Sequence, residues 1–306
     1  MVWLGFLCDS EGVQTGLRRG SKVDVSEGTC DQDAPPGKAN HSYLGIRSPL
    51  KALIIGAGQG RRLLPLTEVE PKALLDIGGK SLLEWQVDAL AERGVAEIVF
   101  LAGFNLPAVE RSLERLGRRW PQTQFRAVYN PFYGVADNLA TCWMARAEMQ
   151  GDFLLLNSDT LFSPPVLHTL LDSAPAPISL AVDHKARYDD DDMKVELDGS
   201  RLLDIGKTLP GERVHGESIG MLLFRGDGPA RFVAALEAAM LEPTALKQWY
   251  LSVIAALARE APVQAVTISG HPWCEIDYPV DIKKARQMVA DWHSAPQDAV
   301  ASTGTS

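Results

Sequence analysis

The feature that most constrains this chain is a regular alternation of short apolar segments with longer helical segments, which starts at Lys51. Four apolar segments predict buried strands, and three segments between them predict helices. The expected strands are 51–56, 96–103, 125–129 and 152–159, and the expected helices are 81–94, 107–117 and 137–149. Strands that alternate with helices require right-handed crossovers, which give a mostly parallel sheet covered on both faces. The sequence therefore predicts a doubly wound α/β fold.

The alternation loosens after about residue 178. "MKVELDGSRLLDIG" predicts two short strands around an Asp198-Gly199 turn, and "ESIGMLLF" predicts a further strand. Helices at 228–241 and 246–260, a strand in "VQAVTI" and a helix at 280–292 follow. We expect one domain over residues 49–293, with a nucleotide-binding half (49–177) and an acceptor-binding half (178–293) built from an appended mixed β-hairpin and helical region. Residues 1–48 and 294–306 have the low apolar content of disordered tails.

The charge of the chain limits its partners. Its formal net charge is −9 and its isoelectric point is about 5.2, whereas nucleic acids and anionic membranes attract surfaces rich in Lys and Arg. We therefore expect no nucleic-acid partner, and anions must be bound by a local concentration of cations. The four cysteines are scattered and no apolar run reaches the roughly 18 residues of a membrane span. These features favour a cytoplasmic protein.

The stretch "KALIIGAGQGRRLLPLTEVEPK" follows the first expected strand and invites three phosphate-binding interpretations. A dinucleotide fingerprint requires a third glycine where this chain has Arg61. A P-loop that ends in "GGKS" requires a first glycine where this chain has Leu74. The third interpretation is a glycine-rich turn whose N–H groups face a triphosphate, with Arg61, Arg62 and Lys72 neutralising its charge. Only the third interpretation fits every residue.

The motif "GAGQGRRLLPLTEVEPK" resembles the GxGxR…PK signature of nucleotidyltransferases that make NDP-sugars and CDP-activated compounds. The resemblance covers roughly residues 51–292 and implies a Rossmann-like fold and an NTP substrate. It places the catalytic arginine and lysine of the family on Arg62 and Lys72, whereas Arg61 departs from the Thr or Ser that often precedes the arginine. The implied nucleotide-binding residues are Gly56, Ala57, Gly58, Gln59, Gly60, Arg61 and Asn138.

Two carboxylates complete the expected site. Asp159 follows an apolar strand and so lies at the carboxyl end of the sheet, where open α/β folds bind ligands. Asp277, in "WCEIDYPVDIKKA", matches the late metal-binding aspartate of the same family. Glu275 and Asp281 are nearby substitutes, although Asp281 is also suited to capping the last helix. We expect Asp159 and Asp277 to hold one Mg²⁺ ion.

The expected reaction is attack by a phosphate oxygen of the acceptor on the α-phosphorus of an NTP, with release of pyrophosphate. A phosphate monoester has a second pKa of about 6, so it is already an anion at neutral pH and needs no general base. The chain accordingly has no histidine in a catalytic context. Positioning and charge neutralisation by Lys72, Arg62 and Mg²⁺ would carry the catalysis.

The substrates are defined less sharply than the reaction. "YNPFYGVADNLATCWMARAE" is similar to a segment of bacterial phosphocholine cytidylyltransferases, which implies CTP as the nucleotide and a base contact from Asn138, a residue equally suited to capping a helix. The acceptor is a small phosphorylated molecule, either phosphocholine or a sugar or polyol phosphate. The residues expected to bind it are Asp137, Lys194 and Glu217. The acidic run "YDDDD" (188–192) is interpreted as a solvated loop.

Four alternatives remain open. One is a sugar-1-phosphate nucleotidyltransferase that uses UTP, GTP or dTTP. A second is a non-catalytic regulatory member of the same fold, which would have no reason to retain Arg62, Lys72, Asp159 and Asp277 together. A molybdopterin nucleotidyltransferase shares the glycine loop, but the "EIDYPVD" segment disfavours it. A Rossmann oxidoreductase would require the glycine that Arg61 replaces.

Overall fold

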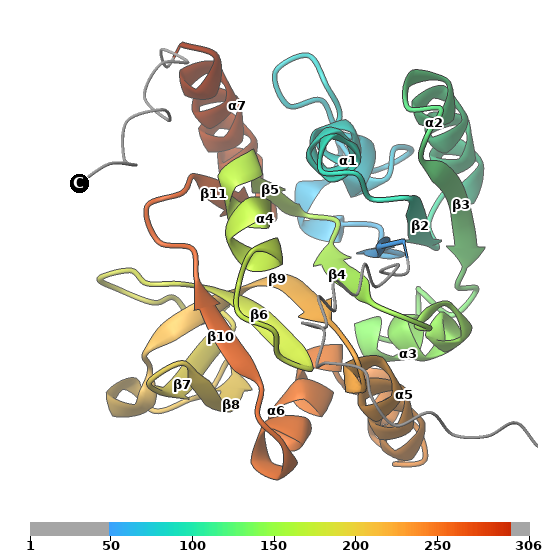
Figure 1. The fold of residues 1–306 in the computed structure, drawn as a ribbon. Coiled ribbons are helices and arrows are strands. Elements are labelled where there is room, and N and C mark those ends of the chain that lie inside the picture. Colours follow the sequence, from blue (N-terminus) through green and yellow to red (C-terminus); the bar gives the residue numbers. More distant parts are fainter. Residues whose placement is uncertain (1–48, 295–306) are drawn as a thin grey trace, which may run out of the picture. The chain divides into compact units, whose positions relative to one another are not determined.

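A mixed nine-stranded sheet with helices on both faces forms the body of the protein (Figure 1). The computed structural model describes residues 49–294. The disorder predicted for 1–48 and 294–306 concerns residues outside this range, apart from Ser294, which ends the last helix. Within the described range, no helix combines the length and the apolar character that crossing a membrane requires.

The structure has eleven strands within residues 49–294, and the first four agree closely with the four expected before residue 178. The strands are β1 (Lys51–Gly56), β2 (Glu97–Ala102), β3 (Gln124–Tyr129), β4 (Phe153–Asn157), β5 (Thr160–Phe162), β6 (Ile178–Asp183), β7 (Lys194–Asp198), β8 (Arg201–Gly206), β9 (Gly216–Phe224), β10 (Gln264–Thr267) and β11 (Trp273–Glu275). The helices are α1 (Leu82–Glu92), α2 (Leu106–Arg119), α3 (Asn138–Met144), α4 (Pro164–Leu171), α5 (Gly228–Ala239), α6 (Tyr250–Glu260) and α7 (Pro279–Ser294). Short 3₁₀ helices include Arg61–Leu63 and Lys72–Leu74.

The sheet is mixed rather than mostly parallel, which corrects the prediction. Its strand order is β3-β2-β1-β4-β9-β6-β10-β8-β7. The first four strands pair in parallel, but β9 is antiparallel to both of its neighbours, β4 and β6. Periodicity identified β9 as a strand but could not identify its partners, because strand pairing joins residues far apart in the chain.

The predicted hairpin is present but is not an appended region. β7 and β8 are antiparallel, and Gly199 in the turn between them has a positive φ of 58°. The hairpin extends the main sheet through β10, and β7 also pairs with the start of β9. The segment that was expected to form a separate acceptor region is thereby continuous with the strands that end beside the glycine loop.

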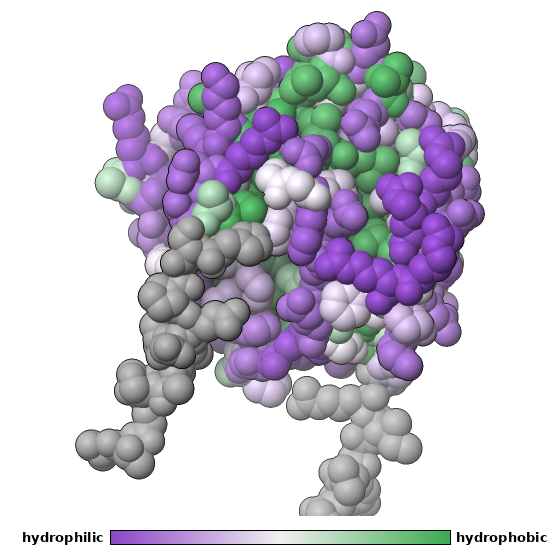
Figure 2. Space-filling view, turned by 90° about the horizontal axis from the view of Figure 1, so that it is seen from above, coloured by the Kyte–Doolittle hydropathy of each residue, from purple (hydrophilic) through white to green (hydrophobic). Residues whose placement is uncertain are grey.

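Alternate residues of the central strands fill two apolar layers, as expected for a sheet buried on both faces. Leu53 and Ile55 of β1 pack with α3, α5 and α6, whereas Ala52 and Ile54 pack with α1, α2 and α4. Each fully buried aliphatic side chain contributes about 1.5–3 kcal/mol, so these two layers hold the strand ends in place. On the face shown in Figure 2, hydrophilic side chains form most of the surface, with hydrophobic residues between them.

Helix α1 begins as its sequence predicts. The Ser81 hydroxyl accepts a hydrogen bond from the Glu84 N–H, and the Glu84 carboxylate accepts one from the Ser81 N–H. Gly94 follows the helix with a φ of 81°, the left-handed conformation of a C-terminal glycine. At α4, Ser163 occupies the N-cap position, but its side chain makes no capping hydrogen bond.

Candidate active site

The glycine loop (residues 56–60) leaves the carboxyl end of β1, and its three glycines serve different purposes. A Cβ atom on Gly56 would lie 2.1 Å from the Phe100 ring, so glycine is required there for packing. Gly60 is left-handed, with a φ of 72°, and begins the short helix that carries Arg62. Gly58 has open space around its Cα atom, which leaves its backbone accessible to a ligand.

Thr67 fixes the far end of the glycine loop. This residue is fully buried, and its hydroxyl donates a hydrogen bond to the Gly60 carbonyl oxygen at 2.8 Å. The Gln59 side chain donates to the Thr67 carbonyl oxygen at 3.4 Å. A cavity lies beside this loop, and four residues predicted to bind nucleotide line it: Gly56, Ala57, Gly58 and Gly60. Gln59 and Arg61, which were also predicted to bind nucleotide, do not line it.

Two short strands that the sequence did not reveal bring the predicted carboxylates together. β5 follows Asp159 directly and pairs with β11, which precedes Asp277. The Ile276 N–H donates to the Asp159 carbonyl oxygen at 3.0 Å and extends this ribbon. Gln86 of α1 supports the turn from behind, because its buried amide donates to the carbonyl oxygens of Asn157 and Thr160, each at 2.8 Å.

Lys72 lies between the two carboxylates. Its Nζ atom is 2.7 Å from Asp159 Oδ2 and 2.9 Å from Asp277 Oδ1. Burial alone would lower the pKa of Lys72, but the two carboxylates outweigh it and raise the pKa above its usual value. The lysine is therefore fully charged at neutral pH and is held at the meeting point of the two expected metal ligands.

Arg62 approaches the same group from the solvent side. Its Nη2 atom is 2.8 Å from Asp277 Oδ2, and its Nη1 atom is 3.1 Å from Asp191 Oδ2 and 3.2 Å from the Tyr278 hydroxyl. Asp191 belongs to the acidic run that was interpreted as a solvated loop. Its side chain is 58% exposed, as expected for a solvated loop, and its carboxylate also contacts a predicted catalytic cation.

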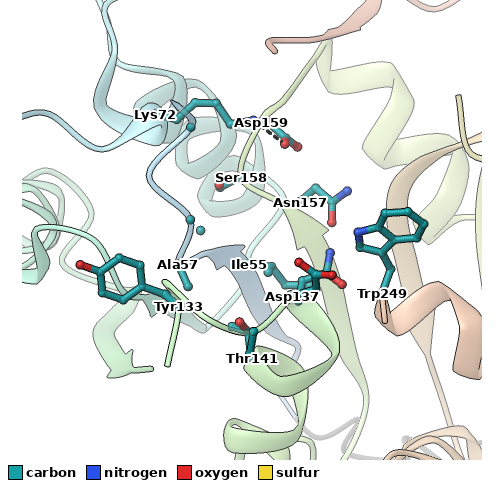
Figure 3. Close-up of a pocket in the computed structure, with 15 residues that line it drawn as sticks. Ile55, Ala57, Lys72, Tyr133, Asp137, Thr141, Asn157, Ser158, Asp159 and Trp249 are labelled. Atoms are coloured by element: carbon teal, nitrogen blue, oxygen red, sulfur yellow. Dashed lines mark hydrogen bonds and ion pairs between the residues drawn. The ribbon is translucent and has the colours of Figure 1, made fainter. Parts of the chain in front are cut away.

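A cavity of about 280 Å³ lies against the glycine loop (Figure 3). We call it the glycine-loop cavity. Lys72 and Asp159 lie at one end of it, while Tyr133, Asp137 and Thr141 lie toward the other end. Trp249 lines one side, so the acceptor-binding half also contributes to this cavity.

Asp137 and Asn138 both line the glycine-loop cavity. Asp137 was predicted to bind the acceptor, but the structure places it with the predicted nucleotide-binding residues instead. Asn138 does not cap its own helix, since Asp137 holds that position. Its Oδ1 atom accepts a hydrogen bond from the Tyr250 N–H at 2.9 Å, which joins α3 to the start of α6.

A second cavity, of about 180 Å³, lies on the other side of Lys72 and is called the central cavity here. Lys72 and Asp159 line both this cavity and the glycine-loop cavity, and Arg62 and Asp277 line the central cavity as well. Lys207 also faces it, with its Nζ atom 3.2 Å from Asp191 Oδ1 and 4.8 Å from the centre of the Trp249 ring. The sequence prediction missed Lys207, whose only signal was a lysine directly after the glycine that ends β8.

A third cavity, of about 580 Å³, adjoins the central one through Asp191, Glu275 and Asp277. We call it the acidic cavity, because most of its charged lining residues are carboxylates. Glu217, predicted to bind the acceptor, lines it but is buried and paired with Lys185 at 2.8 Å. Burial raises the pKa of Glu217 to about 7 although Lys185 opposes the shift. Loss of water around the Glu275 carboxyl group, followed by repulsion from Asp159 and Asp277, raises the pKa of Glu275.

Lys194 does not face any of these three cavities. Its side chain is buried, and its Nζ atom donates to the carbonyl oxygens of Asp189 at 2.5 Å and Lys207 at 2.9 Å. The prediction that Lys194 contacts the acceptor was therefore wrong. The sequence pattern identified a strand next to the site, but the side chain of Lys194 points into the protein.

Oxygen atoms suited to a hard cation are present at the meeting point of Asp159 and Asp277. Asp159 Oδ1 is buried and has no hydrogen-bond partner among residues 49–294. Within the same range, no three Asp, Glu, His or Cys side chains are grouped as a complete metal site. A pair of carboxylates suits Mg²⁺, which usually keeps several water ligands.

Comparisons with known proteins agree with this geometry. The family model described as "MobA-like NTP transferase domain" matches residues 52–273, which is most of the chain. The chain belongs to the MobA-like NTP transferase family. Cytidylyltransferases and sugar-phosphate nucleotidyltransferases both occur among its relatives.

Two curated relatives of this MobA-like protein illustrate the range of enzymes to which it is similar. A bifunctional IPC transferase and DIPP synthase of Aquifex aeolicus is 26% identical over 77% of this chain and 51% of its own length. A choline-phosphate cytidylyltransferase of Streptococcus pneumoniae is 30% identical over 37% of this chain and 46% of its own length. The chain thus spans about half the length of these relatives.

Solved structures share the fold of this MobA-like protein. The CTP:phosphocholine cytidylyltransferase of Streptococcus pneumoniae superposes with a TM-score of 0.65, covering 79% of this chain and 100% of that chain at 20% sequence identity. At that identity the likeness shows the fold alone, which is a mixed α/β nucleotidyltransferase fold.

Proposed function

We propose that this protein transfers CMP from CTP to a small phosphorylated acceptor and releases pyrophosphate. The observation that carries the proposal is the position of Lys72, which lines both the glycine-loop cavity and the central cavity and contacts Asp159 and Asp277. A cation at the boundary of two cavities can contact both reacting phosphates at once.

In the proposed reaction, an oxygen of the acceptor phosphate forms a bond to the α-phosphorus of CTP. The bond from the α-phosphorus to the bridging oxygen breaks, and pyrophosphate leaves with the electron pair. Because the attacking phosphate monoester is largely deprotonated at neutral pH, no side chain has to remove a proton. Lys72 would stabilise the charge between the two phosphates, and Arg62 would stabilise the departing pyrophosphate.

Mg²⁺ fits the site on chemical grounds. Asp159 and Asp277 would hold it, and the buried, unpartnered Asp159 Oδ1 is an oxygen available as a ligand. When bound, the ion would neutralise charge on the triphosphate oxygens. In the free protein the Lys72 ammonium group supplies positive charge at this position.

The preference for CTP rests on relatives and on the far end of the glycine-loop cavity. A choline-phosphate cytidylyltransferase is among the relatives. The Asn138 Oδ1 atom is engaged by Tyr250, but its Nδ2 group can donate a hydrogen bond to a base. Thr141, whose hydroxyl oxygen accepts from Asn130, retains its own O–H donor. Donors of this kind match the O2 and N3 acceptors of cytosine.

The acceptor phosphate is proposed to bind in the central cavity, where Lys207 faces Lys72 and Arg62. The rest of the acceptor would then extend into the acidic cavity, whose carboxylates are accompanied by Trp273 and Tyr278. Carboxylates and aromatic faces favour a cationic group, because both attract positive charge. This lining supports a phosphocholine-like acceptor more than a neutral sugar or polyol phosphate.

A substrate matrix tests the proposal. The purified protein with Mg²⁺ would be given CTP, UTP, GTP, dTTP or ATP together with phosphocholine, aminoethylphosphonate, inositol phosphate or a hexose 1-phosphate, and pyrophosphate release would be measured. We expect release with CTP and a cationic acceptor. Release only with UTP, GTP or dTTP and a hexose 1-phosphate would replace the proposal with the sugar-nucleotide alternative, and silence in every combination would favour a non-catalytic role.

A further inference from the structure

The buried lysine of β7 connects two segments of the site that are separate in sequence. Lys194 Nζ donates to the carbonyl oxygen of Asp189, in the loop after β6, and to that of Lys207, directly after β8. The side chain is 8% exposed. A charged ammonium group in such a position is costly unless its donors are used, so these two hydrogen bonds hold the segments at a fixed separation.

Both segments carry a charged side chain that faces the central cavity. Asp191 lies two residues after Asp189, and its carboxylate contacts Lys207 at 3.2 Å and Arg62 at 3.1 Å. Lys207 itself rests on the Trp249 ring. Lys194 therefore fixes, through the backbone, the positions from which Asp191 and Lys207 reach the cavity.

The hydrogen bonds of Lys194 to the backbone and the ion pair between Asp191 and Lys207 should respond differently to an acceptor phosphate. A phosphate group that binds Lys207 competes with the Asp191 carboxylate for the same ammonium group. The contacts of Lys194 are with backbone carbonyl oxygens, which a phosphate does not displace. Lys207 would thus remain in place when its ion pair with Asp191 is exchanged for the substrate.

We infer that Lys194 is a positioning residue for the acceptor phosphate, acting through the backbone of Lys207. The inference rests on the proposed function and deepens it. Since small displacements of a binding group lower the effective concentration of the reacting atoms, loss of the link should weaken acceptor binding specifically. Binding of CTP should change little, because the glycine loop makes no contact with Lys194.

Arg213 provides a matched control on the same hairpin. It is paired with Glu196 of β7 and Asp204 of β8, so it also stabilises the hairpin. It does not line the central cavity or the acidic cavity. A substitution of Arg213 should therefore weaken the hairpin without moving Lys207.

The test compares Lys194→Met, Lys194→Arg and Arg213→Met with the unmodified protein, using CTP, phosphocholine and Mg²⁺. We expect Lys194→Met to raise the KM for phosphocholine at least tenfold and to leave the KM for CTP within twofold. Lys194→Arg should restore most of the loss, because arginine keeps the donors. Arg213→Met should lower the thermal midpoint with both KM values unchanged.

Amide hydrogen exchange supplies a readout that does not depend on turnover. Amides at 187–192 and 207–209 should exchange faster in Lys194→Met than in Arg213→Met. A phosphocholine KM that stays at the unmodified value while kcat falls would overturn the inference and assign Lys194 a purely structural role. If the unmodified protein turned over no substrate pair, the proposed function would fail, and unchanged exchange in Lys194→Met would separately overturn the link itself.

Discussion

The glycine-loop cavity and the acidic cavity both share lining residues with the central cavity, yet they are built in different ways. The first is lined by residues at the carboxyl ends of β1 and β4, by residues 133–141, and by Lys72 and Trp249. The second is formed by side chains from residues 183–192, 217 and 273–284, and most of its charges are negative. The comparison teaches that small and polar residues line the cavity proposed for the nucleotide, whereas charged and mostly acidic side chains line the cavity proposed for the rest of the acceptor.

Lys72 lines the glycine-loop cavity and the central cavity, so removing it should affect the use of both substrates. We expect Lys72→Ala to lower kcat/KM by about 1,000-fold for both substrates, because the charge at the reacting phosphates is lost. Steady-state pyrophosphate release would measure this loss, and circular dichroism would confirm folding. Lys283→Ala, an exposed lysine of α7, is the control. Near-normal turnover of Lys72→Ala would refute the proposed role of Lys72.

Asp277 tests whether the boundary between the cavities is a metal site. We expect Asp277→Asn to raise the Mg²⁺ concentration needed for half-maximal activity by at least about 10- to 100-fold, the loss usual even for residues that only support a metal ligand. Titration of activity with MgCl₂ provides the measurement, and Asp291→Asn on the exposed part of α7 is the control. An unchanged Mg²⁺ requirement would remove Asp277 from the metal site.

The pH dependence of stability tests the burial of Glu217 in the acidic cavity. Its pKa is raised from 4.5 to about 7, so the folded state binds this proton more tightly than the unfolded state does. The stabilisation is present below about pH 4.5 and is lost as the pH rises through 7. Between pH 5 and 7.5, the free energy of unfolding relative to Glu217→Gln should fall by roughly 2 kcal/mol. Urea unfolding at several pH values would measure it, and parallel pH profiles for the two proteins would contradict the assignment.

Asp191 lines the central cavity and the acidic cavity, and its substitution should have the smallest effect. Its carboxylate neutralises Arg62 and Lys207 in the free protein, so Asp191→Asn should tighten pyrophosphate binding by about threefold, the range of an exposed ion pair. Calorimetry at low salt would detect the change. Asp190→Asn removes the same charge from the neighbouring residue, and equal effects of the two substitutions would show that only net charge matters.

The parts of the fold that were predicted correctly are those specified by local sequence. The helix expected over 81–94, the glycine loop after β1 and the aspartate after β4 all depend on residues close together in the chain. The mixed sheet, the β5–β11 ribbon and the cavity position of Lys207 depend on pairing between distant segments. Three-residue strands such as β5 have too few residues to show a period, so the sequence could not reveal them.

The errors at the site have a similar cause. Lys194 and Asp137 were predicted to bind the acceptor because their segments were expected near the site. The segments do lie near the site, but the direction of each side chain depends on packing. Lys194 turns inward to two carbonyl oxygens, and Asp137 turns toward the glycine loop. The acidic run lies in an exposed loop, as expected, but the contact of Asp191 with Arg62 joins residues 129 positions apart and could not be predicted from the sequence.

The β5–β11 ribbon has a consequence for the order in which the protein becomes competent. Asp159 and the glycine loop leave the ribosome early, but the strand that delivers Asp277 is made near the end of translation. A growing chain can bury both apolar layers around β1 while its reactive lysine still lacks one carboxylate. If the proposed mechanism holds, a chain made only as far as β10 would lack Asp277 and should not act on nucleotide.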